Sequence, residues 1–372
     1  MSALALADLL PTAATFTALH RLVKSQAARR PGVYEFLDAT GGTIYVGKAK
    51  DLRSRLLSYF TAPWPESKSA RLVRCASHIR WRCLPSEFAA LLEEQRLITR
   101  LKPAYNVRGN LRRGRLSFVT LTGDPAPRLR VTEQTQGRGA FYYGPFAARG
   151  RTADAIRTLG DLLGLRDCSD RTPMRFEDQP SLFDAPLAAA CIRHELGTCL
   201  GPCAARCSVA AYAGAARRAA DFLDGRAAHP LDVVLDAMAD AAEAGAFERA
   251  AHWLDRFESL EWLFGALARL RAAAQGLSFV YGVKDRSGGA DDRVYVVRHG
   301  VVRAEAPWPR TPIERAAFAA EVERHAAPAE PAPAARSAPE MDQLLLVMSW
   351  FRRYPEEYEQ TTPYRVWQEG GS

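Results

Sequence analysis

Two short strings decide the fold of the N-terminal third: Gly32-Val33-Tyr34 and, ten residues further on, Tyr45-Val46-Gly47. The residues between them include Asp38-Ala39-Thr40-Gly41-Gly42, a turn with glycine at its end. Runs rich in β-formers at 33–37 and 43–46 flank that turn and predict an antiparallel hairpin. A basic stretch, 48–60, follows at once, and Asp51 is placed to cap a helix there.

Outward from the hairpin, the sequence predicts a third strand over 79–84 and a strong helix over 87–101 that Lys102-Pro103 ends. At 100° per residue, Glu94 falls inside the apolar arc of this helix, between Ile98 and Leu101. A carboxylate among leucines is unfavourable unless it pairs with an arginine or binds a metal. The adjacent candidate phosphate site favours a metal ligand.

Basic and phenolic side chains are predicted to gather near that carboxylate. Arg55 and Tyr59 are four residues apart and share a helix face. Lys48 precedes the helix, and Tyr34 and Tyr45 lie in the hairpin strands, so these groups could converge on a phosphate. On strand propensity alone, both hairpin tyrosines could instead be ordinary β-formers.

Charge is unevenly distributed along the 372 residues. The net charge is +8, but residues 20–115 hold 20 Lys and Arg against 7 Asp and Glu, and the remainder is slightly acidic. A basic N-terminal third indicates a polyanionic partner such as nucleic acid. The alternative is an arginine-rich surface that reflects genome composition, since arginine strongly outnumbers lysine.

Targeting signals are not evident. No apolar run reaches the length of a membrane helix. Residues 1–19 are rich in Ala and Leu but contain Asp8 and no Lys or Arg, unlike a secretory signal. We therefore expect a cytoplasmic protein.

Five of the seven cysteines cluster in the middle of the chain: Cys168, Cys191, Cys199, Cys203 and Cys207. In a reducing compartment such a cluster indicates a metal site rather than disulfides. Four thiolates suit an iron–sulfur cluster or zinc, and spacing alone does not choose between them.

The remaining chain predicts an α+β protein. Strands are expected at 117–122 and 129–132, helices at 152–163 and 210–223, and a loop at 169–190. Apolar residues at helical spacing over 230–270, interrupted by Gly245, predict an antiparallel helix hairpin. Strands at 279–283 and 294–304, an Ala/Pro-rich linker at 326–339 and a last helix at 342–351 complete the pattern.

The N-terminal residues resemble the GIY-YIG nuclease domain of UvrC, a component of the bacterial excinuclease ABC. The likeness extends from the two tyrosine strings through 88–98 to Leu101-Lys102-Pro103-Ala104-Tyr105-Asn106-Val107. It implies a small nuclease domain, a short antiparallel sheet flanked by helices, that cuts DNA with Mg²⁺ or Mn²⁺. The implied metal ligand is Glu94, and the other implied catalytic positions are Tyr34, Tyr45, Gly47, Lys48, Arg55, Tyr59 and Asn106.

The implied mechanism uses a tyrosine, favouring Tyr45, to take the proton from the attacking water. Lys48 is placed to lower the pKa of that phenol, and Arg55 would clamp the phosphate. We assign DNA contacts to the basic residues around the domain: Lys50, Arg53, Lys102, Arg108, Arg112 and Arg113.

The middle of the chain is also similar to UvrC, at 142–146, 165–168 and 191–203. That likeness implies a [4Fe–4S] cluster on Cys168, Cys191, Cys199 and Cys203, with zinc as the alternative. The loop between Cys168 and Cys191 is longer than usual in the family, and Cys207 could compete as a ligand. The stretch 238–251 looks like the UVR motif, which implies docking of residues 231–264 on the excinuclease helicase, UvrB; an ordinary packing hairpin is the alternative.

The resemblance covers roughly residues 24–270. It predicts an N-terminal extension (1–23), a nuclease domain (24–110), a Cys-rich middle domain (111–228), a UVR-like hairpin (229–272) and a small C-terminal α+β region of unknown role (277–372). Residues 277–372 resemble neither the second nuclease nor the DNA clamps of UvrC, so the plan is closer to the short excinuclease Cho. The implied function is a single metal-dependent incision, 3′ to a lesion, in nucleotide excision repair. The alternatives are a structure-specific nuclease that acts alone and a non-catalytic DNA- or partner-binding scaffold.

Overall fold

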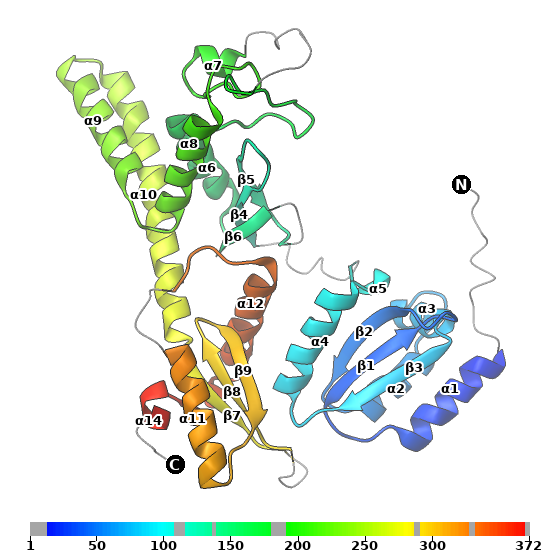
Figure 1. The fold of residues 1–372 in the computed structure, drawn as a ribbon. Coiled ribbons are helices and arrows are strands. Elements are labelled where there is room, and N and C mark those ends of the chain that lie inside the picture. Colours follow the sequence, from blue (N-terminus) through cyan, green and yellow to red (C-terminus); the bar gives the residue numbers. More distant parts are fainter. Residues whose placement is uncertain are drawn as a thin grey trace. The chain divides into compact units, whose positions relative to one another are not determined.

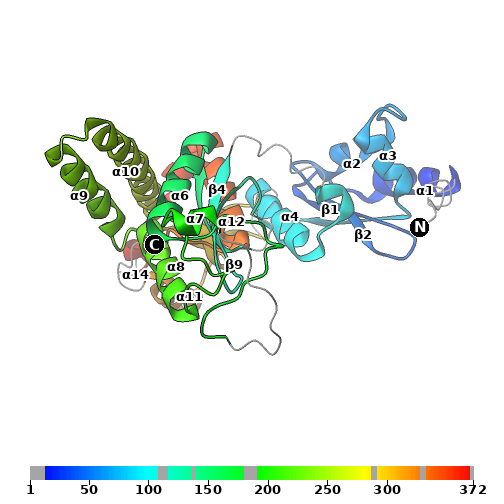
Figure 2. The same ribbon diagram turned by 90° about the horizontal axis from the view of Figure 1, so that it is seen from above.

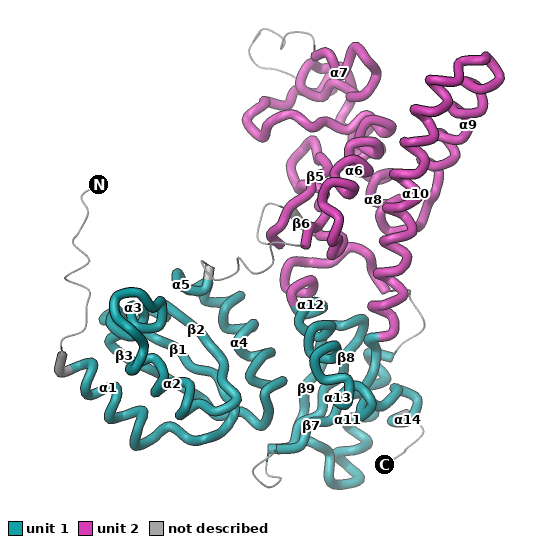
Figure 3. The backbone as a smooth tube through the Cα atoms, turned by 180° about the vertical axis from the view of Figure 1, so that it is seen from behind, with its two compact units in different colours: residues 1–112, 277–329, 343–372 teal, residues 113–276, 330–342 magenta. Residues whose placement is uncertain are grey.

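The computed structural model describes residues 13–107, 116–135, 139–179, 191–285, 291–326 and 332–368. They form two compact units, coloured separately in Figure 3. Unit 1 contains residues 1–112, 277–329 and 343–372, and unit 2 contains 113–276 and 330–342. Within the described ranges, none of the helices combines the length and apolar character needed to span a membrane.

The first sheet of unit 1 is antiparallel, with strand order β2-β1-β3. Its strands are β1 (Gly32–Leu37), β2 (Thr43–Ala49) and β3 (His78–Cys83). The Asp38 carboxylate accepts hydrogen bonds from the backbone N–H of Thr40 and Gly42, and Gly41 adopts a φ of 83°. This turn fixes the register in which Tyr34 faces Gly47 and Phe36 faces Tyr45, as the predicted hairpin requires.

Helices cover both faces of this sheet: α1 (Ala13–Gln26), α2 (Leu52–Phe60), α3 (Lys68–Cys75), α4 (Glu87–Leu101) and α5 (Ala104–Val107). Side chains alternate along a strand. Tyr34 and Phe36 therefore pack with Leu52 and Leu56 of α2, whereas Val33 packs with α4. Asp51 and Ser86 cap α2 and α4 by accepting from the N–H of Ser54 and Ala89. In Figure 1, α4 lies beside β2, the free edge of the sheet.

The second sheet of unit 1 is built from the C-terminal residues, with order β10-β7-β8-β9. It contains β7 (Phe279–Val283), β8 (Arg293–Arg298), β9 (Val301–Pro307) and β10 (Thr361–Thr362), with helices α11 (Pro312–Ala326), α12 (Ala338–Arg353), α13 (Pro355–Glu359) and α14 (Tyr364–Gln368). The predicted helix at 342–351 is longer, and α11, α13 and α14 were not predicted.

The two faces of this second sheet have different partners. Val280, Val294 and Val296 pack with α11 and α14. Tyr281 and Tyr295 pack with α12 and with Phe88 of α4. Helix α4 therefore contributes to the cores on both sides of it, which joins the C-terminal sheet to the first one within unit 1.

Unit 2 begins with a three-stranded sheet of order β5-β4-β6, made of β4 (Ser117–Thr122), β5 (Leu129–Thr132) and β6 (Gly139–Phe146). Its helices are α6 (Arg149–Leu163), α7 (Ile192–Glu195), α8 (Val209–Leu223), α9 (His229–Glu243) and α10 (Phe247–Gly276). Strand β6 was not predicted. Arg336 forms a two-way backbone bridge with Tyr142 of β6.

The predicted helix hairpin is present as α9 and α10, which run side by side in both Figure 1 and Figure 2. Gly245 turns the chain with a φ of 68°. Val234 and Leu260 are buried as the pattern requires. Leu235, Leu254 and Phe247 were expected to be part of the apolar face, but they are 38%, 44% and 74% exposed.

Candidate active site at the edge of the first sheet

Three of the predicted side chains form one hydrogen-bonded group on the α2 face of the sheet. The hydroxyls of Tyr34 and Tyr59 are 2.8 Å apart. The Arg55 guanidinium donates to Tyr34 Oη at 3.3 Å and to Tyr59 Oη at 3.5 Å. Arg55 is exposed, whereas both tyrosines are nearly fully buried. The structure thus places an exposed guanidinium against two buried phenols.

Gly47 is needed because the Tyr34 ring lies directly over it, at the register position where the two residues face each other. A Cβ built at residue 47 would lie 2.4 Å from Tyr34 Oη and 2.5 Å from Tyr34 Cζ. Any side chain at this position would therefore displace the ring. The glycine of the second string acts by leaving room for the tyrosine of the first.

Tyr45 stands beside this group, 6.3 Å from Tyr34 between ring centroids. The Lys68 ammonium lies 5.6 Å from the centre of the Tyr45 ring. We expected Lys48 to lower the pKa of Tyr45, and the structure contradicts this. Burial, with the nearby Tyr59 phenol, raises the pKa of Tyr45. Burial likewise raises the pKa of Tyr34 to about 12 and that of Tyr59 further.

The free edge of β2 is closed by two of the predicted residues. Asn106 of α5 accepts from the N–H of Val46 and donates to its carbonyl, both at 2.8 Å. Two residues further along the same edge, the N–H of Lys48 donates to the Glu94 carboxylate. An unpaired strand edge leaves backbone groups unsatisfied. Asn106 and Glu94 therefore satisfy alternate positions of one edge strand, and Asn106 contributes through the backbone of Val46.

Glu94 is a partly buried carboxylate without an ion-pair partner. Among the described residues, no Lys or Arg nitrogen lies within 4.0 Å of it, whereas its neighbour Glu93 pairs with Arg82 at 2.5 Å. Burial raises the pKa of Glu94 to about 7, and the more distant charges of Lys48 and Arg55 oppose this rise. A desolvated carboxylate with both cations nearby but not in contact has the properties of a cation ligand.

The ion-pair partner of Lys48, Glu87, was not predicted from the sequence. The Lys48 ammonium pairs with Glu87 at 3.0 Å, at the start of α4. The Tyr354 hydroxyl donates to the other oxygen of Glu87 at 3.4 Å. Lys48 and Glu87 lie on the α4 face, so the Lys48 ammonium is held away from the tyrosine group. Among sequence features, only the strand register of Lys48 and the start of α4 at Glu87 could have indicated that these two residues pair.

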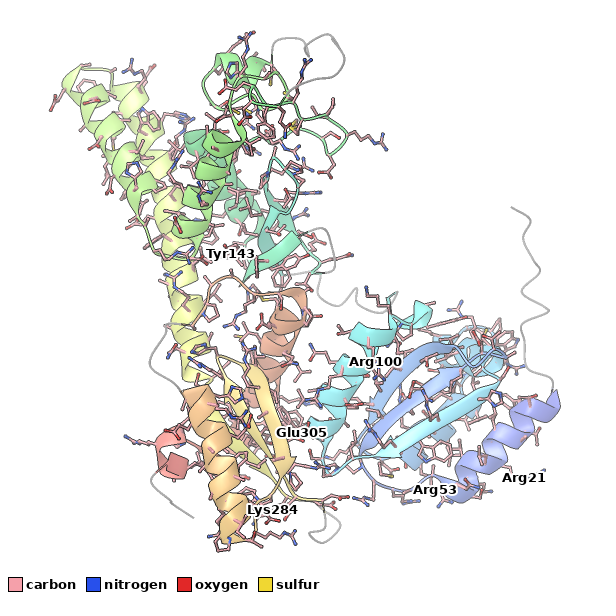
Figure 4. The ribbon with its side chains drawn as sticks, viewed as in Figure 1. Arg21, Arg53, Arg100, Tyr143, Lys284 and Glu305 are labelled. Carbon is pink, nitrogen blue, oxygen red and sulfur yellow. The ribbon has the colours of Figure 1, made fainter. Side chains whose placement is uncertain are left out.

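Of the residues assigned to DNA contact, Lys50 and Lys102 are exposed and Arg53 is partly exposed. Figure 4 labels Arg53 on α2. Lys102 is the left-handed C-cap of α4, with a φ of 46°, and its N–H donates to Ile98. Arg108, Arg112 and Arg113 lie outside the described residues.

The five clustered cysteines all lie in unit 2. Cys191 precedes the short helix α7, and Cys199 and Cys207 are buried. Burial, with the neighbouring Cys191 and Cys168 thiols, raises the pKa of both Cys199 and Cys203. The four predicted ligands are thus electrostatic neighbours. Within the described ranges, however, no three His, Cys, Asp or Glu side chains are arranged as a metal site.

Comparison with protein families gives two matches. Residues 30–107 match the UvrC-like GIY-YIG domain, and residues 116–222 match the middle domain of the UvrC/Cho excinucleases. The first range contains the tyrosine group, Glu94 and Asn106. The second contains the five clustered cysteines.

Curated relatives agree with these matches. The UvrABC system protein C of Alcanivorax borkumensis is 34% identical over 276 residues, which cover 73% of this chain and 43% of the relative. The proteins of the same name from Rhizobium meliloti and Haloarcula marismortui are 35% and 36% identical and are covered over 32% and 39% of their lengths. The chain spans less than half the length of each of these relatives.

A solved structure also matches, that of the GIY-YIG N-terminal endonuclease domain of UvrC from Thermotoga maritima, bound to its catalytic divalent cation, magnesium. It is 33% identical, and the match covers 24% of this chain and 96% of that chain with a TM-score of 0.22. The two family matches show that the chain is UvrC-like, with the GIY-YIG domain of that family followed by its middle domain.

Proposed function

We propose that this chain is a DNA endonuclease that makes a single divalent-metal-dependent incision in damaged DNA, 3′ to the lesion, in nucleotide excision repair. The observation that carries the proposal is the Glu94 carboxylate. It is partly buried, has a raised pKa and has no ion-pair partner among the described residues, at the edge of a sheet that also carries the Tyr34–Tyr59–Arg55 group. The names of the relatives support the repair role.

The residues at this edge fit a magnesium ion. Mg²⁺ is commonly bound by one or two carboxylates and keeps several of its water ligands, so a single carboxylate beside phenols suits this ion. When bound at Glu94, the ion would neutralise charge on the phosphate and acidify a nearby water or phenol. The chain's own residues bind, orient and move a proton: Arg55 binds a phosphate oxygen, Tyr34 and Tyr59 orient it, and Tyr45, after losing its own proton, receives the proton of the attacking water. Because burial raises all three tyrosine pKa values, we infer that these phenols are protonated at neutral pH until a further cation arrives.

A nicking assay tests the function. The full chain is incubated with a duplex that carries one site-specific lesion and with Mg²⁺, in the presence and absence of the excinuclease helicase UvrB. We expect one nick on the 3′ side of the lesion, and only with the metal. Partner-independent cutting of undamaged branched DNA would instead support a lone structure-specific nuclease. Absence of any metal-dependent cutting would support a non-catalytic scaffold.

We also propose that Cys168, Cys191, Cys199 and Cys203 hold a [4Fe–4S] cluster, with zinc as the alternative metal. The donor set supports this proposal, because the Cys168 and Cys191 thiols lie close enough to help raise the pKa of Cys199 and of Cys203. Their role would be structural or in damage recognition, since unit 1 carries the nuclease residues.

Anaerobically purified protein should be brown and contain iron and sulfide. Cys199→Ser should lose most of the iron, because a hydroxyl is a poor replacement for a thiolate ligand. Cys207→Ser is the matched control: it removes a buried thiol of the same cluster and should keep the iron. Colourless protein with stoichiometric zinc would reject the iron–sulfur assignment.

Finally, we propose that the α9–α10 hairpin, residues 231–264, docks on the helicase UvrB. Two large apolar side chains support this, because Phe247 is 74% and Leu254 is 44% exposed. Exposed apolar groups of this size are typical of interaction sites.

The double variant Phe247→Ser, Leu254→Ser should weaken binding to UvrB by about tenfold or more, since a few apolar anchors dominate such interfaces. Calorimetry with purified proteins measures this. Ile313→Ser is the control, because Ile313 is 83% exposed on α11, outside the hairpin. Equal binding by the double variant and the wild type would make the hairpin an ordinary packing element.

A further inference from the structure

A cavity of about 670 Å³ lies within unit 1, between the start of α4 and the C-terminal sheet. Its volume is within the range of small-molecule sites. Five aromatic side chains contribute to its wall: Tyr281, Trp308, Trp350, Tyr354 and Trp367. None of these aromatic residues is among the predicted nuclease residues, so the nuclease site does not account for the cavity.

Trp308 is held in one orientation although it is 39% exposed. Its ring lies over Gly282, where a Cβ would come within 2.3 Å of Trp308 Cζ3. The ring also meets Trp367 edge to face, with 5.9 Å between centroids. The cavity thus offers a preset aromatic face.

The charged residues that line the cavity restrict the charge that a ligand can carry. Lys50, Lys284 and Glu356 are exposed, and Figure 4 labels Lys284 directly after β7. Glu87 and Glu357 are partly buried and accept from Tyr354 at 3.4 Å and from Tyr281 at 2.6 Å. The lysines disfavour a cationic ligand, and the inner carboxylates disfavour a polyanion. A planar, neutral group that donates hydrogen bonds and carries one phosphate on its exposed side fits both conditions.

The cavity adjoins the candidate active site. Glu87 lines it and pairs with the ammonium of Lys48 at 3.0 Å. Lys50, two residues after Lys48, lines it as well. A DNA strand held at Glu94 would therefore pass close to the lysines of the cavity.

We propose that this cavity binds the base of an unstacked nucleotide, with the aromatic walls stacking on the base and Lys50 and Lys284 facing its phosphate. This proposal rests on the proposed function, because it assumes that the chain binds DNA. The nucleotide is either part of the DNA strand bound at the neighbouring site or a free mononucleotide, because both present the same base and phosphate.

Two binding measurements in EDTA test this. The first compares, by fluorescence anisotropy at fixed salt, a duplex with one bulged nucleotide and the same duplex fully paired. An unpaired base costs little to unstack, and stacking on an aromatic ring is substantial. We expect the full chain to prefer the bulged duplex by about tenfold. The second measures saturable quenching of tryptophan fluorescence by adenosine monophosphate without DNA.

Trp308→Ala should abolish whichever of these signals the wild type shows, and Trp308→Phe should restore most of it. Trp64→Ala is the matched control: Trp64 is 45% exposed in the same unit, stacks on Arg74 and does not line the cavity. If Trp308→Ala does not fold, Lys284→Ala, at an exposed position, should weaken the same signal.

Bulge preference assigns the cavity to the bound strand, and mononucleotide binding without bulge preference assigns it to a free nucleotide. The absence of both signals, or their persistence in Trp308→Ala, would overturn the proposal. Both measurements are made in EDTA, without free divalent metal, so neither depends on DNA cutting. Loss of incision in the nicking assay would refute the proposed function and leave the binding result standing.

Discussion

Glu94→Gln should abolish Mg²⁺-dependent incision while leaving the fold and DNA binding intact. A metal ion that neutralises developing charge contributes several kcal/mol to a phosphodiester transition state, so loss of its carboxylate ligand should slow cutting by about a thousandfold or more. Gln keeps an oxygen that accepts from the N–H of Lys48, so the edge of β2 stays satisfied. Single-turnover nicking with excess protein measures the effect.

The thermal stability of Glu94→Gln distinguishes the loss of a metal ligand from damage to the fold. Burial raises the pKa of Glu94 from 4.5 to about 7. The folded state thus binds this proton more tightly than the unfolded chain does, and the resulting stabilisation is complete below pH 4.5 and is lost as the pH rises through 7. Above pH 7 in EDTA, Glu94→Gln should therefore unfold at the same temperature as the wild type or a higher one. Glu93→Gln is the matched control and should cut normally, because Glu93 pairs with Arg82 on the polar side of α4.

Gly47→Ala should damage both the stability of the first sheet and the candidate site, although it adds a single methyl group. The new Cβ would overlap the Tyr34 ring, which is 1% exposed and hydrogen-bonded to Tyr59. Overpacking of this kind costs about 1–3 kcal/mol. Displacing the Tyr34–Tyr59–Arg55 group by about 1 Å should lower the incision rate by about a hundredfold. Thermal unfolding and nicking are measured on the same preparation.

Gly150→Ala provides the control for adding a methyl group. Gly150 lies in α6, and a Cβ there has no neighbour within 4 Å. That variant should unfold at an equal or higher temperature, because alanine favours helix. Wild-type cutting by Gly47→Ala would show that the close approach of Tyr34 to residue 47 has no bearing on the site.

Much of the first sheet could be predicted from local signals. The turn between the tyrosine strings marked the hairpin, Asp51 marked the start of α2, and Lys102-Pro103 marked the end of α4. The 100° rotation per residue predicted that Glu94 lies toward the core, and burial does raise its pKa. These features depend on residues close together in sequence, where propensity and periodicity are informative.

The partners of individual side chains could not be predicted in this way. Lys48 pairs with Glu87, and Asn106 binds the backbone of Val46, because of tertiary contacts 39 and 60 residues apart in sequence. The strands at 279–283 and 294–304 were predicted, but strand β10 and the packing of α4 on the C-terminal sheet were missed for a related reason. The two-residue strand β10 pairs with β7 across the intervening helices, and α4 supplies Phe88 to that core. Neither feature has a local sequence signal.

Anomalous diffraction from crystals soaked in Mn²⁺ tests the central claim most directly. The account predicts a peak within about 2.5 Å of a Glu94 carboxylate oxygen, at the β2 edge of the sheet that carries Tyr34 and Tyr45, and no such peak in Glu94→Gln. A fully occupied peak elsewhere in the first sheet, with the Glu94 carboxylate hydrogen-bonded only within the protein, would contradict it.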